Sequence, residues 1–226
     1  MRKRKPAPLR SGQVEPELKE SSDPVSWEEV FGCRAPLEVD IGFGKGEFLL
    51  TLSASHPEVN YIGIDYNRSR VLKFRDKLVR LERSNVRLAC GNSSALVPVF
   101  FPNGSIRAFT INFPDPWPKR RHHKRRLITS HFGEELARAL VPGGVLTVAT
   151  DFKVYADEII RVLAKVKALE PEFGPPGHVT ALPGRSETLY ERKYREEGRT
   201  NLYMRYKRTA DPTVDGEGGR CLKDQG

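Results

Sequence analysis

The chain has 226 residues, of which 38% are hydrophobic, and a formal net charge of +9. That length suits a single α/β domain with a substantial core, and the excess of positive charge favours an anionic partner, most commonly a nucleic acid. No stretch is long and apolar enough to cross a bilayer, and the basic first ten residues lack the apolar segment of a secretory signal. The three cysteines are too widely spaced for a disulfide framework or a zinc site, so we expect a cytoplasmic protein without a metal.

Composition also divides the chain into three parts. We expect residues 1–34 to form a flexible basic arm with a short lead-in, because Lys, Arg, Pro and Ser dominate its first part. Residues 35–208 carry the alternating apolar segments of one ordered domain. Residues 209–226 are small and polar, which predicts a disordered tail.

The first ordered segment, Leu37–Ile41, reads as a buried strand, and a turn with Gly42, Gly44 and Gly46 follows it directly. Apolar residues then recur at helical spacing, which completes the strand, turn and helix of a nucleotide-binding unit. The glycine spacing differs from that of dinucleotide-binding turns, and Asp40 precedes the first glycine by two residues. A carboxylate there would repel a pyrophosphate but could accept from an ammonium group. If the turn binds a ligand, these features favour S-adenosylmethionine over NAD. A plain tight turn without a ligand is an equal alternative.

Polar residues also follow the next two strands. Tyr61–Ile64 is followed by Asp65, about twenty residues after the glycines, where an acid can hydrogen-bond ribose hydroxyls. Asn67 could cap the helix that comes next. Val86–Cys90 is a third strand, and Asn92 after it could face an adenine edge. Asp65 could also be an ordinary acid at a strand end, but together with the glycine turn the pattern favours ligand binding.

A proline-rich segment follows the fourth predicted strand, Ile106–Ile111. Three prolines within five positions fix the backbone and remove its donors, so neither helix nor sheet can continue there. Between the prolines stand Asp115 and Trp117, and a basic run follows: Lys119, Arg120, Arg121, Lys124, Arg125 and Arg126. A rigid carboxylate beside a cationic run suits a site that binds a polyanion and presents one charged group to it. The alternative is a surface turn followed by a solvated charged stretch.

Helices and strands alternate through the second half of the domain. The expected elements are a helix at Thr129–Leu140 closed by Pro142-Gly143-Gly144, a strand at Val145–Ala149, a helix at Val154–Leu169 and a last strand at Asn201–Lys207. Asp151 most simply caps the helix that follows it, with a ligand contact as the alternative. Because ligands of open α/β sheets bind beyond the carboxyl ends of the strands, the polar residues that follow the first four strands should share one site.

Six segments of the chain match one known family in type and order. They are Asp40 to Gly46, Tyr61 to Asp65, Asn112 to Lys119, His122 to Arg126, Thr150-Asp151, and Thr188 to Glu191. Together they resemble the bacterial tRNA (guanine-N7)-methyltransferase family, which is Rossmann-like. The proline-flanked segment with its basic tail is the specific part, whereas many methyltransferases share the glycine turn. The resemblance implies an α/β fold with a seven-stranded, mostly parallel sheet, one antiparallel strand and helices on both faces.

The resemblance also implies S-adenosylmethionine as cofactor, with tRNA as partner, and it assigns site residues. Cofactor contacts would match Asp40, Asp65, Asn92 and Asp115, beside the turn at Gly42 and Gly44. Substrate contacts would match Lys119, Asp151, Thr188, Leu189, Tyr190 and Glu191. The family usually has Glu where this chain has Asp40 and Asp65, and Asp where it has Asn92. An amide can still donate to and accept from an adenine edge.

The implied reaction transfers a methyl group to N7 of a guanine in the variable loop of tRNA. N7 already carries an in-plane lone pair, so catalysis is mainly a matter of positioning. Asp115 is the candidate catalytic residue, because a carboxylate would offset the positive charge that develops on the purine or accept from its N–H groups. The basic run would hold RNA phosphates through Arg120, Arg121, Lys124, Arg125 and Arg126, with His122 and His123 facing RNA or solvent rather than a metal.

Two alternatives stay open at this point, and the protein could be a monomer or a homodimer. One alternative is a methyltransferase acting on an exocyclic base amine, because Asn112-Phe113-Pro114-Asp115 loosely resembles the Asn-Pro-Pro-aromatic motif of those enzymes. The other is a non-catalytic RNA-binding protein with a degenerate cofactor pocket.

Overall fold

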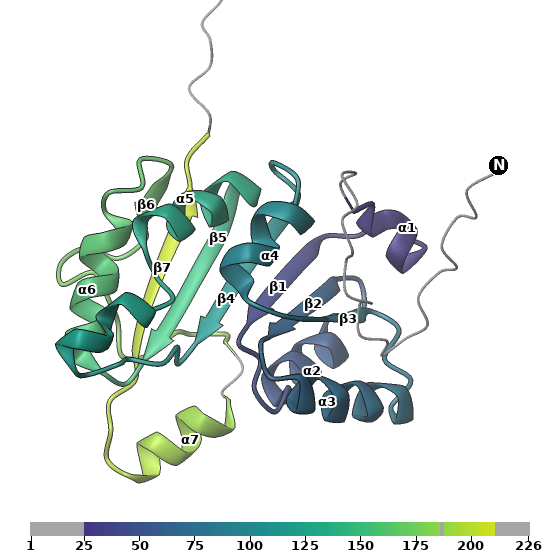
Figure 1. The fold of residues 1–226 in the computed structure, drawn as a ribbon, viewed down its shortest axis with the longest axis horizontal. Helices are drawn as coiled ribbons and strands as arrows, with labels where there is room; N and C mark the ends of the chain where they lie inside the picture. The colour runs from purple at the N-terminus through teal and green to yellow at the C-terminus, as the bar shows by residue number, and fades with distance from the viewer. Residues whose placement is uncertain (1–24, 186–187, 211–226) are drawn as a thin grey trace, which may run out of the picture.

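The fold is an open, twisted sheet with helices on both faces (Figure 1). The computed structural model describes residues 25–185 and 188–210. The arm and tail expected at the two ends fall largely on residues 1–24 and 211–226, outside the described residues, so their disorder stays a prediction.

The sheet has seven strands in the order β3-β2-β1-β4-β5-β7-β6. They are β1 (Leu37–Ile41), β2 (Asn60–Asp65), β3 (Val86–Cys90), β4 (Ile106–Asn112), β5 (Leu140–Thr150), β6 (Leu169–Pro171) and β7 (Leu202–Arg208). Strands β1 to β5 pair in parallel, while β7 runs antiparallel to both β5 and β6. The predicted sheet, with its last strand reversed, is confirmed.

Two hydrophobic cores lie on opposite faces of the sheet. The helices are α1 (Trp27–Phe31), α2 (Glu47–Ser55), α3 (Arg68–Arg80), α4 (Ser93–Phe100), α5 (Ser130–Ala139), α6 (Lys153–Leu163) and α7 (Leu189–Glu196), with a 3-10 helix η1 (Arg120–Arg125). Side chains of a strand point alternately to its two faces, and in β2 Ile62 and Ile64 join the core under α4, α5 and α6, whereas Tyr61 joins the core under α2 and α3. The helices on both faces therefore agree with the prediction.

Polar side chains cap several of these helices, and the sequence predicts one of these caps, at Asn67. Asn67 Oδ1 accepts from the backbone N–H of Arg70 at 3.1 Å, which fixes the start of α3 as predicted. Thr129 Oγ1 accepts from the N–H of Phe132 at 3.1 Å at the start of α5. Both caps satisfy backbone donors that have no partner inside the helix.

Strand β5 begins earlier than predicted. The segment Pro142-Gly143-Gly144 does not close a helix; it lies inside β5 as an irregularity, where Ile106 pairs with Leu140 and Ala108 with Val145. Gly144 has no room for a side chain, because a Cβ would lie 2.8 Å from the carbonyl oxygen of Val141 and 3.0 Å from that of Arg107 in β4. These glycines serve a crowded bulge in a strand, which local sequence does not distinguish from a helix end.

Helix α6 differs from its prediction at both ends. It ends at Leu163, and the following apolar residues lead into the edge strand β6, where Leu169 pairs with Arg208. Asp151 does not cap it: the N-cap position is Phe152, and Asp151 instead accepts from Arg199 Nη1 at 2.9 Å. A charged partner distant in sequence has replaced the local capping contact.

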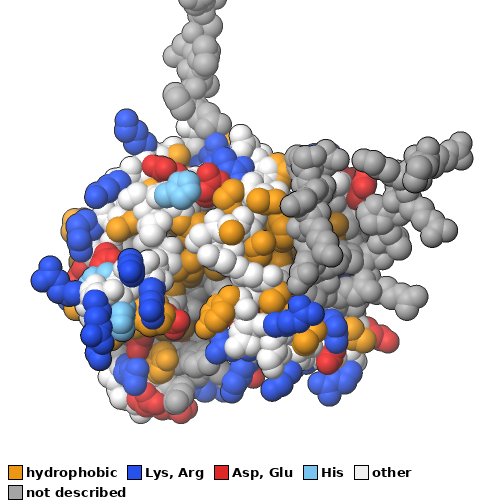
Figure 2. Space-filling view, in the orientation of Figure 1, with side chains coloured by type: hydrophobic (Ala, Val, Ile, Leu, Met, Phe, Trp, Pro, Cys, Tyr) orange, Lys and Arg blue, Asp and Glu red, His pale blue; other side chains and the backbone are white. Residues whose placement is uncertain are grey.

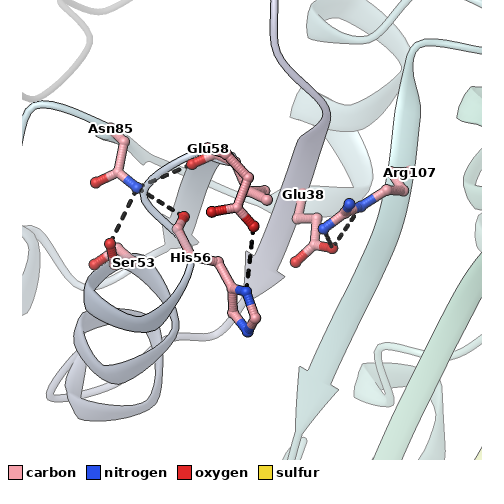
Figure 3. Close-up of polar contacts among 7 residues, drawn as sticks. Glu38, Ser53, His56, Glu58, Asn85 and Arg107 are labelled. Carbon is pink, nitrogen blue, oxygen red and sulfur yellow. Dashed lines mark hydrogen bonds and ion pairs between the residues drawn. The ribbon is translucent and has the colours of Figure 1, made fainter.

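Polar contacts also close the amino-terminal edge of the sheet (Figure 3). The amide nitrogen of Asn85 donates to the carbonyl oxygens of Ser53, His56 and Val59 at 2.9–3.3 Å. Arg107 of β4 and Glu38 of β1 form an ion pair at 2.6 Å beside them. These contacts tie the connections between helices and strands together, away from the edge that holds the candidate site.

Candidate active site

The polar residues predicted to follow the parallel strands do lie at one edge of the sheet. Asp40 belongs to β1, Asp65 ends β2, Asn92 follows β3 and Asn112 ends β4. Strand β7 starts at this edge because it runs antiparallel to β5, and α7 lies just beyond it (Figure 1). The edge thus gathers polar groups from both halves of the chain.

The glycine turn presents open backbone at this edge. Gly42, Gly44 and Gly46 have φ values of 75°, 58° and 76°, in the left-handed region that favours glycine. A side chain on Gly46 would collide with the ring of Phe74, so packing also requires that glycine. A Cβ on Gly42 would meet nothing within 4 Å, and one on Gly44 only a backbone oxygen at 3.9 Å. The first two glycines therefore leave space in which a ligand can approach the backbone.

Asp65 ties this turn to the end of β2. The residue is only 3% exposed, and its carboxylate accepts from the N–H of Gly44 at 3.1 Å and from the N–H of Asn67 at 2.8 Å. Arg70 lies 3.9 Å away. A carboxylate can accept about four hydrogen bonds, so lone pairs remain for ligand hydroxyls.

Asp40 is buried without a full set of partners. Its side chain is 3% exposed, and within the described part of the chain Oδ1 has no hydrogen-bond partner. Burial raises the pKa of Asp40 to about 7, an effect that the Arg185 guanidinium opposes and the Asp65 carboxylate reinforces. Such a group would gain most from a cationic donor placed beside it.

Asn92 uses its oxygen locally. Oδ1 accepts from the N–H of Ser94 at 3.0 Å and caps α4, while the residue itself is exposed. The amide nitrogen is the group that it could offer to an adenine edge.

The proline-rich loop holds two residues in strained conformations. Phe113 and Trp117 have positive φ values of 49° and 41°, which non-glycine residues rarely adopt. The Phe113 ring packs edge-on against Tyr194 of α7, with 5.5 Å between centroids. Asp115 lies between the two strained residues and is exposed. The strain is held by surrounding contacts, so Asp115 stands on a fixed backbone.

Arg126 supplies part of that support. The sequence placed it with the RNA-facing cations, but the structure buries it, with 4% of its surface exposed. Its Nε donates to the carbonyl oxygen of Pro116 at 2.8 Å, and Nη2 donates to that of Trp117 at 3.4 Å. The guanidinium also pairs with Glu158 and lies 4.8 Å from the ring centroid of Tyr155, both in α6. Arg126 therefore anchors the loop from beneath.

The remaining cations of the run are exposed. They occupy the loop and η1, and they are Lys119, Arg120, Arg121, Lys124 and Arg125. The Trp117 ring packs edge-on against His122, with 5.7 Å between centroids, and its centroid lies 5.0 Å from the Arg125 guanidinium. Figure 2 shows blue and pale blue side chains gathered at one margin of the hollowed face. This surface can meet a polyanion.

Thr188 and Glu191 form a capping box at the start of α7. Thr188 Oγ1 accepts from the N–H of Glu191 at 3.1 Å, and the Glu191 carboxylate accepts from the N–H of Thr188. Glu191 is fully buried and also accepts from the hydroxyl of Tyr203 at 2.7 Å. The side chains of Leu189 and Tyr190 lie outside the described residues. The segment expected to contact substrate has a structural task of its own.

Arg185 is a site residue that sequence reasoning missed. Its guanidinium contacts the Glu191 carboxylate and Asn112 Oδ1, and lies 4.8 Å from the ring centroid of Phe48. It also lowers the pKa of Asp40 through its charge. One side chain thus links α2, β4 and α7 across the sheet edge. A lone Arg in a Pro-Gly loop carries no local signal of this position.

Asp151 and Lys119, both predicted to contact substrate, have different surroundings in the described part of the chain. Asp151 is held by Arg199, which also pairs with Glu197 at 3.1 Å. Lys119 is exposed at the start of η1. Among the described residues, no group of His, Cys, Asp and Glu could hold a metal ion, and no helix there is long and apolar enough to span a membrane.

The strand order, the glycine turn after β1 and the acid at the end of β2 define a Rossmann-like methyltransferase fold. The 16S rRNA methyltransferase KamB is similar, with a TM-score of 0.63 at 16% identity, covering 88% of this chain and 100% of that one. Geranyl diphosphate C-methyltransferase from Streptomyces coelicolor A3(2), solved with S-adenosyl-L-homocysteine, matches with a TM-score of 0.52 at 15% identity, covering 78% and 76%. These likenesses concern the fold alone.

Sequence comparison gives the family. Residues 34–204 match the family model Methyltransf_4, described as "Putative methyltransferase". The tRNA (guanine-N(7)-)-methyltransferase of Alkalilimnicola ehrlichii is 35% identical over 85% of this chain and 81% of its own length. Those of Geobacter metallireducens and Halorhodospira halophila are 35% and 39% identical, covering 91% and 73% of their lengths and 85% and 75% of this chain. The chain belongs to the tRNA (guanine-N7)-methyltransferase family, which confirms the resemblance.

Proposed function

We propose that the protein transfers a methyl group from S-adenosylmethionine to N7 of a guanine in the variable loop of tRNA. The observation that carries the proposal is a pair of acids at one sheet edge. Asp40 is buried with Oδ1 unpartnered among the described residues, and Asp115 is exposed on a fixed loop. The first suits a cationic part of a cofactor and the second a charge that develops on a substrate. Family membership supports S-adenosylmethionine as the cofactor and tRNA as the substrate.

The carboxyl ends of β1, β2 and β3 suit three parts of the cofactor. Asp40 would accept from the ammonium group, and Asp65 would accept from ribose hydroxyls with the lone pairs that Gly44 and Asn67 leave. Asn92 would donate from its amide nitrogen to the adenine. When bound, S-adenosylmethionine supplies a methyl group activated by a positively charged sulfur.

The protein's part in the chemistry is positioning and charge stabilisation. N7 of guanine needs no base to remove a proton, because its lone pair is already available. The strained loop holds Asp115 at a set position, where its carboxylate would stabilise the positive charge that transfer places on the purine. Thus Asp115 is the proposed catalytic residue.

The exposed cations would hold the RNA. Lys119, Arg120, Arg121, Lys124 and Arg125 can contact phosphates, and the target base has to leave its stack to reach the sheet edge. A tRNA substrate would agree with a cytoplasmic location.

Mass spectrometry of nucleosides tests the proposal. Unmodified tRNA incubated with the protein and S-adenosylmethionine should yield 7-methylguanosine, and tRNA with 7-deazaguanine at the target should bind nearly normally yet yield no methylated base. A product methylated on an exocyclic amine, or full methylation of the deaza substrate, would overturn N7 transfer. Absence of cofactor binding would point to a non-catalytic RNA-binding protein.

A further inference from the structure

A cavity of about 460 Å³ lies at the same sheet edge, beside the cofactor-side residues. It is lined by residues of α7, by the start of β7 and by residues 180–185. Its volume lies within the range of pockets that enclose small ligands. Three polar side chains in its wall matter for what it could hold: Arg185, Glu191 and Asn201.

Two of the residues that line this cavity each hold a buried polar atom without a partner among the described residues. Asn201 is 9% exposed, and its Nδ2 donates to the backbone oxygen of Glu191 at 3.3 Å, but its Oδ1 accepts nothing from the described residues. Arg185 uses its terminal nitrogens on Glu191 and Asn112, and across the same part of the chain its Nε has no acceptor. Buried polar atoms are seldom left unpaired, so an unpaired donor and an unpaired acceptor on residues that line one cavity favour a ligand that offers the opposite pair.

The pairing edge of guanine offers that pair. O6 is an acceptor and the neighbouring N1–H is a donor, whereas adenine presents an amine donor and an N1 acceptor at the same two places. The Glu191 carboxylate is less suited to accept the N1–H of the base, because it already accepts from Arg185, from the hydroxyl of Tyr203 and from the N–H of Thr188.

We propose that this cavity receives the unstacked target guanine, with Arg185 Nε donating to O6 and Asn201 Oδ1 accepting from N1–H. The inference rests on the proposed function and adds to it the residues that select the base. A guanine held by its pairing edge keeps N7 unengaged, as methyl transfer requires. Arg185 also contacts Asn112 at the end of β4, so the selecting group is joined to the strand that leads into the Asp115 loop.

The test compares tRNAs with guanosine, inosine or 2,6-diaminopurine at the target position, all of which carry N7. Inosine keeps O6 and N1–H, so its kcat/KM should stay within about threefold of that of guanosine. 2,6-Diaminopurine reverses the pair and should react about 10- to 100-fold more slowly, the usual effect of mismatched buried hydrogen bonds. Equal rates on guanosine and diaminopurine with the wild-type protein would overturn the inference without any variant.

Variants then locate the selection. In Asn201→Leu the ratio of guanosine to diaminopurine rates should fall to about threefold or less. Asn85→Leu is the matched control: it removes another amide that donates to backbone oxygens, at the far edge of the sheet (Figure 3), so it should lose stability but keep the ratio. An unchanged ratio in Asn201→Leu would remove Asn201 from base selection while leaving N7 transfer intact. No 7-methylguanosine from guanosine tRNA with the wild type would instead overturn the proposed function.

Discussion

Arg126 Nε lies 2.8 Å from the carbonyl oxygen of Pro116 and donates to it from a buried position, although Arg125 beside it is exposed. The two neighbouring arginines therefore do different work. Arg125 lies against the Trp117 ring on the surface, and Arg126 joins the loop to Glu158 of α6. One basic run combines a surface for a polyanion with an internal support for the acid that precedes it.

This division predicts different effects of two alanine substitutions. Arg126→Ala should lower the free energy of unfolding by about 3–5 kcal/mol, because it strands a partly buried Glu158, and should lower kcat through the displaced loop. The salt dependence of tRNA binding should stay unchanged. Arg125→Ala should leave stability nearly intact and reduce the slope of log K against log salt by somewhat less than one unit. Denaturation and salt titrations check both; an equal loss of slope in the two variants would return Arg126 to the RNA-facing group.

Neutralising the exposed cations together should weaken the electrostatic grip on RNA. With Arg120, Arg121, Lys124 and Arg125 changed to Gln, we expect the slope of log K against log salt to fall by about 3 units, since each phosphate contact contributes somewhat less than one. Cofactor affinity should not change, because the proposed contacts with the ammonium group, ribose and adenine come from the ends of β1, β2 and β3. A wild-type slope in this variant would show that the run is merely solvated.

Binding of the cofactor should depend on pH through Asp40. Burial raises the pKa of Asp40 to about 7, so at lower pH the cofactor's ammonium group meets a neutral carboxyl. Affinity should then rise about tenfold per unit up to about pH 7, and fall again above about pH 8, where the cofactor's own α-amino group loses its proton. In Asp40→Asn the rise below pH 7 should vanish. Calorimetry from about pH 5.5 to about pH 8.5 measures the affinity on both sides of the two transitions.

The same raised pKa has a consequence for the protein without its cofactor. From about pH 4 to about pH 7 the folded state holds a proton on Asp40 that the unfolded chain releases, so this group's contribution to stability decreases as the pH rises. Asp40→Asn should remove that contribution. A variant that keeps the wild-type pH dependence of unfolding would place the proton elsewhere.

Asp65 should carry cofactor affinity without affecting RNA. Asp65→Ala should weaken S-adenosylmethionine by about 1–3 kcal/mol, because ribose hydroxyls lose an acceptor and the N–H groups of Gly44 and Asn67 lose theirs. Affinity for tRNA, measured without cofactor, should be unchanged. Calorimetry showing normal cofactor affinity would remove Asp65 from the ribose site.

Asp115→Asn should separate binding from chemistry. The amide keeps the size of the side chain but cannot offset positive charge, so we expect single-turnover rates to fall about 10²–10³-fold with both ligands still bound. Lower affinity for tRNA at an unchanged rate would assign Asp115 to binding instead. Normal rates would leave N7 transfer standing without Asp115 at its centre.

Features fixed by neighbouring residues could be predicted from the sequence. The strands around the glycine turn and the Asn67 cap follow from local chemistry, and the parallel arrangement then brings Asp40 and Asp65 together. The segment at Pro142 misled the prediction, because proline and glycine mark both helix ends and bulges.

Features fixed by distant partners could not be predicted. Arg126 looks like its neighbours in the sequence, but its burial depends on partners in α6, among them Glu158, 32 residues further on. Arg185 contacts Asn112, which lies 73 residues earlier in the chain, and the hydrophobic periodicity of the sequence does not predict this contact. Asp151 likewise pairs with Arg199, 48 residues away, instead of capping α6 as predicted.

The reversed direction of β7 has a consequence for the order in which the site comes into being during synthesis. The cofactor-side acids are complete once β1 and β2 have been made, but Asn201 and Tyr203 belong to one of the last described segments of the chain. A ribosome-bound fragment that ends before Asn201 would carry Asp40, Asp65 and the glycine turn, yet lack Asn201 and Tyr203 of the proposed guanine cavity. On the proposed assignment of the site, the growing chain would therefore complete its cofactor-binding residues well before the residues that select the base.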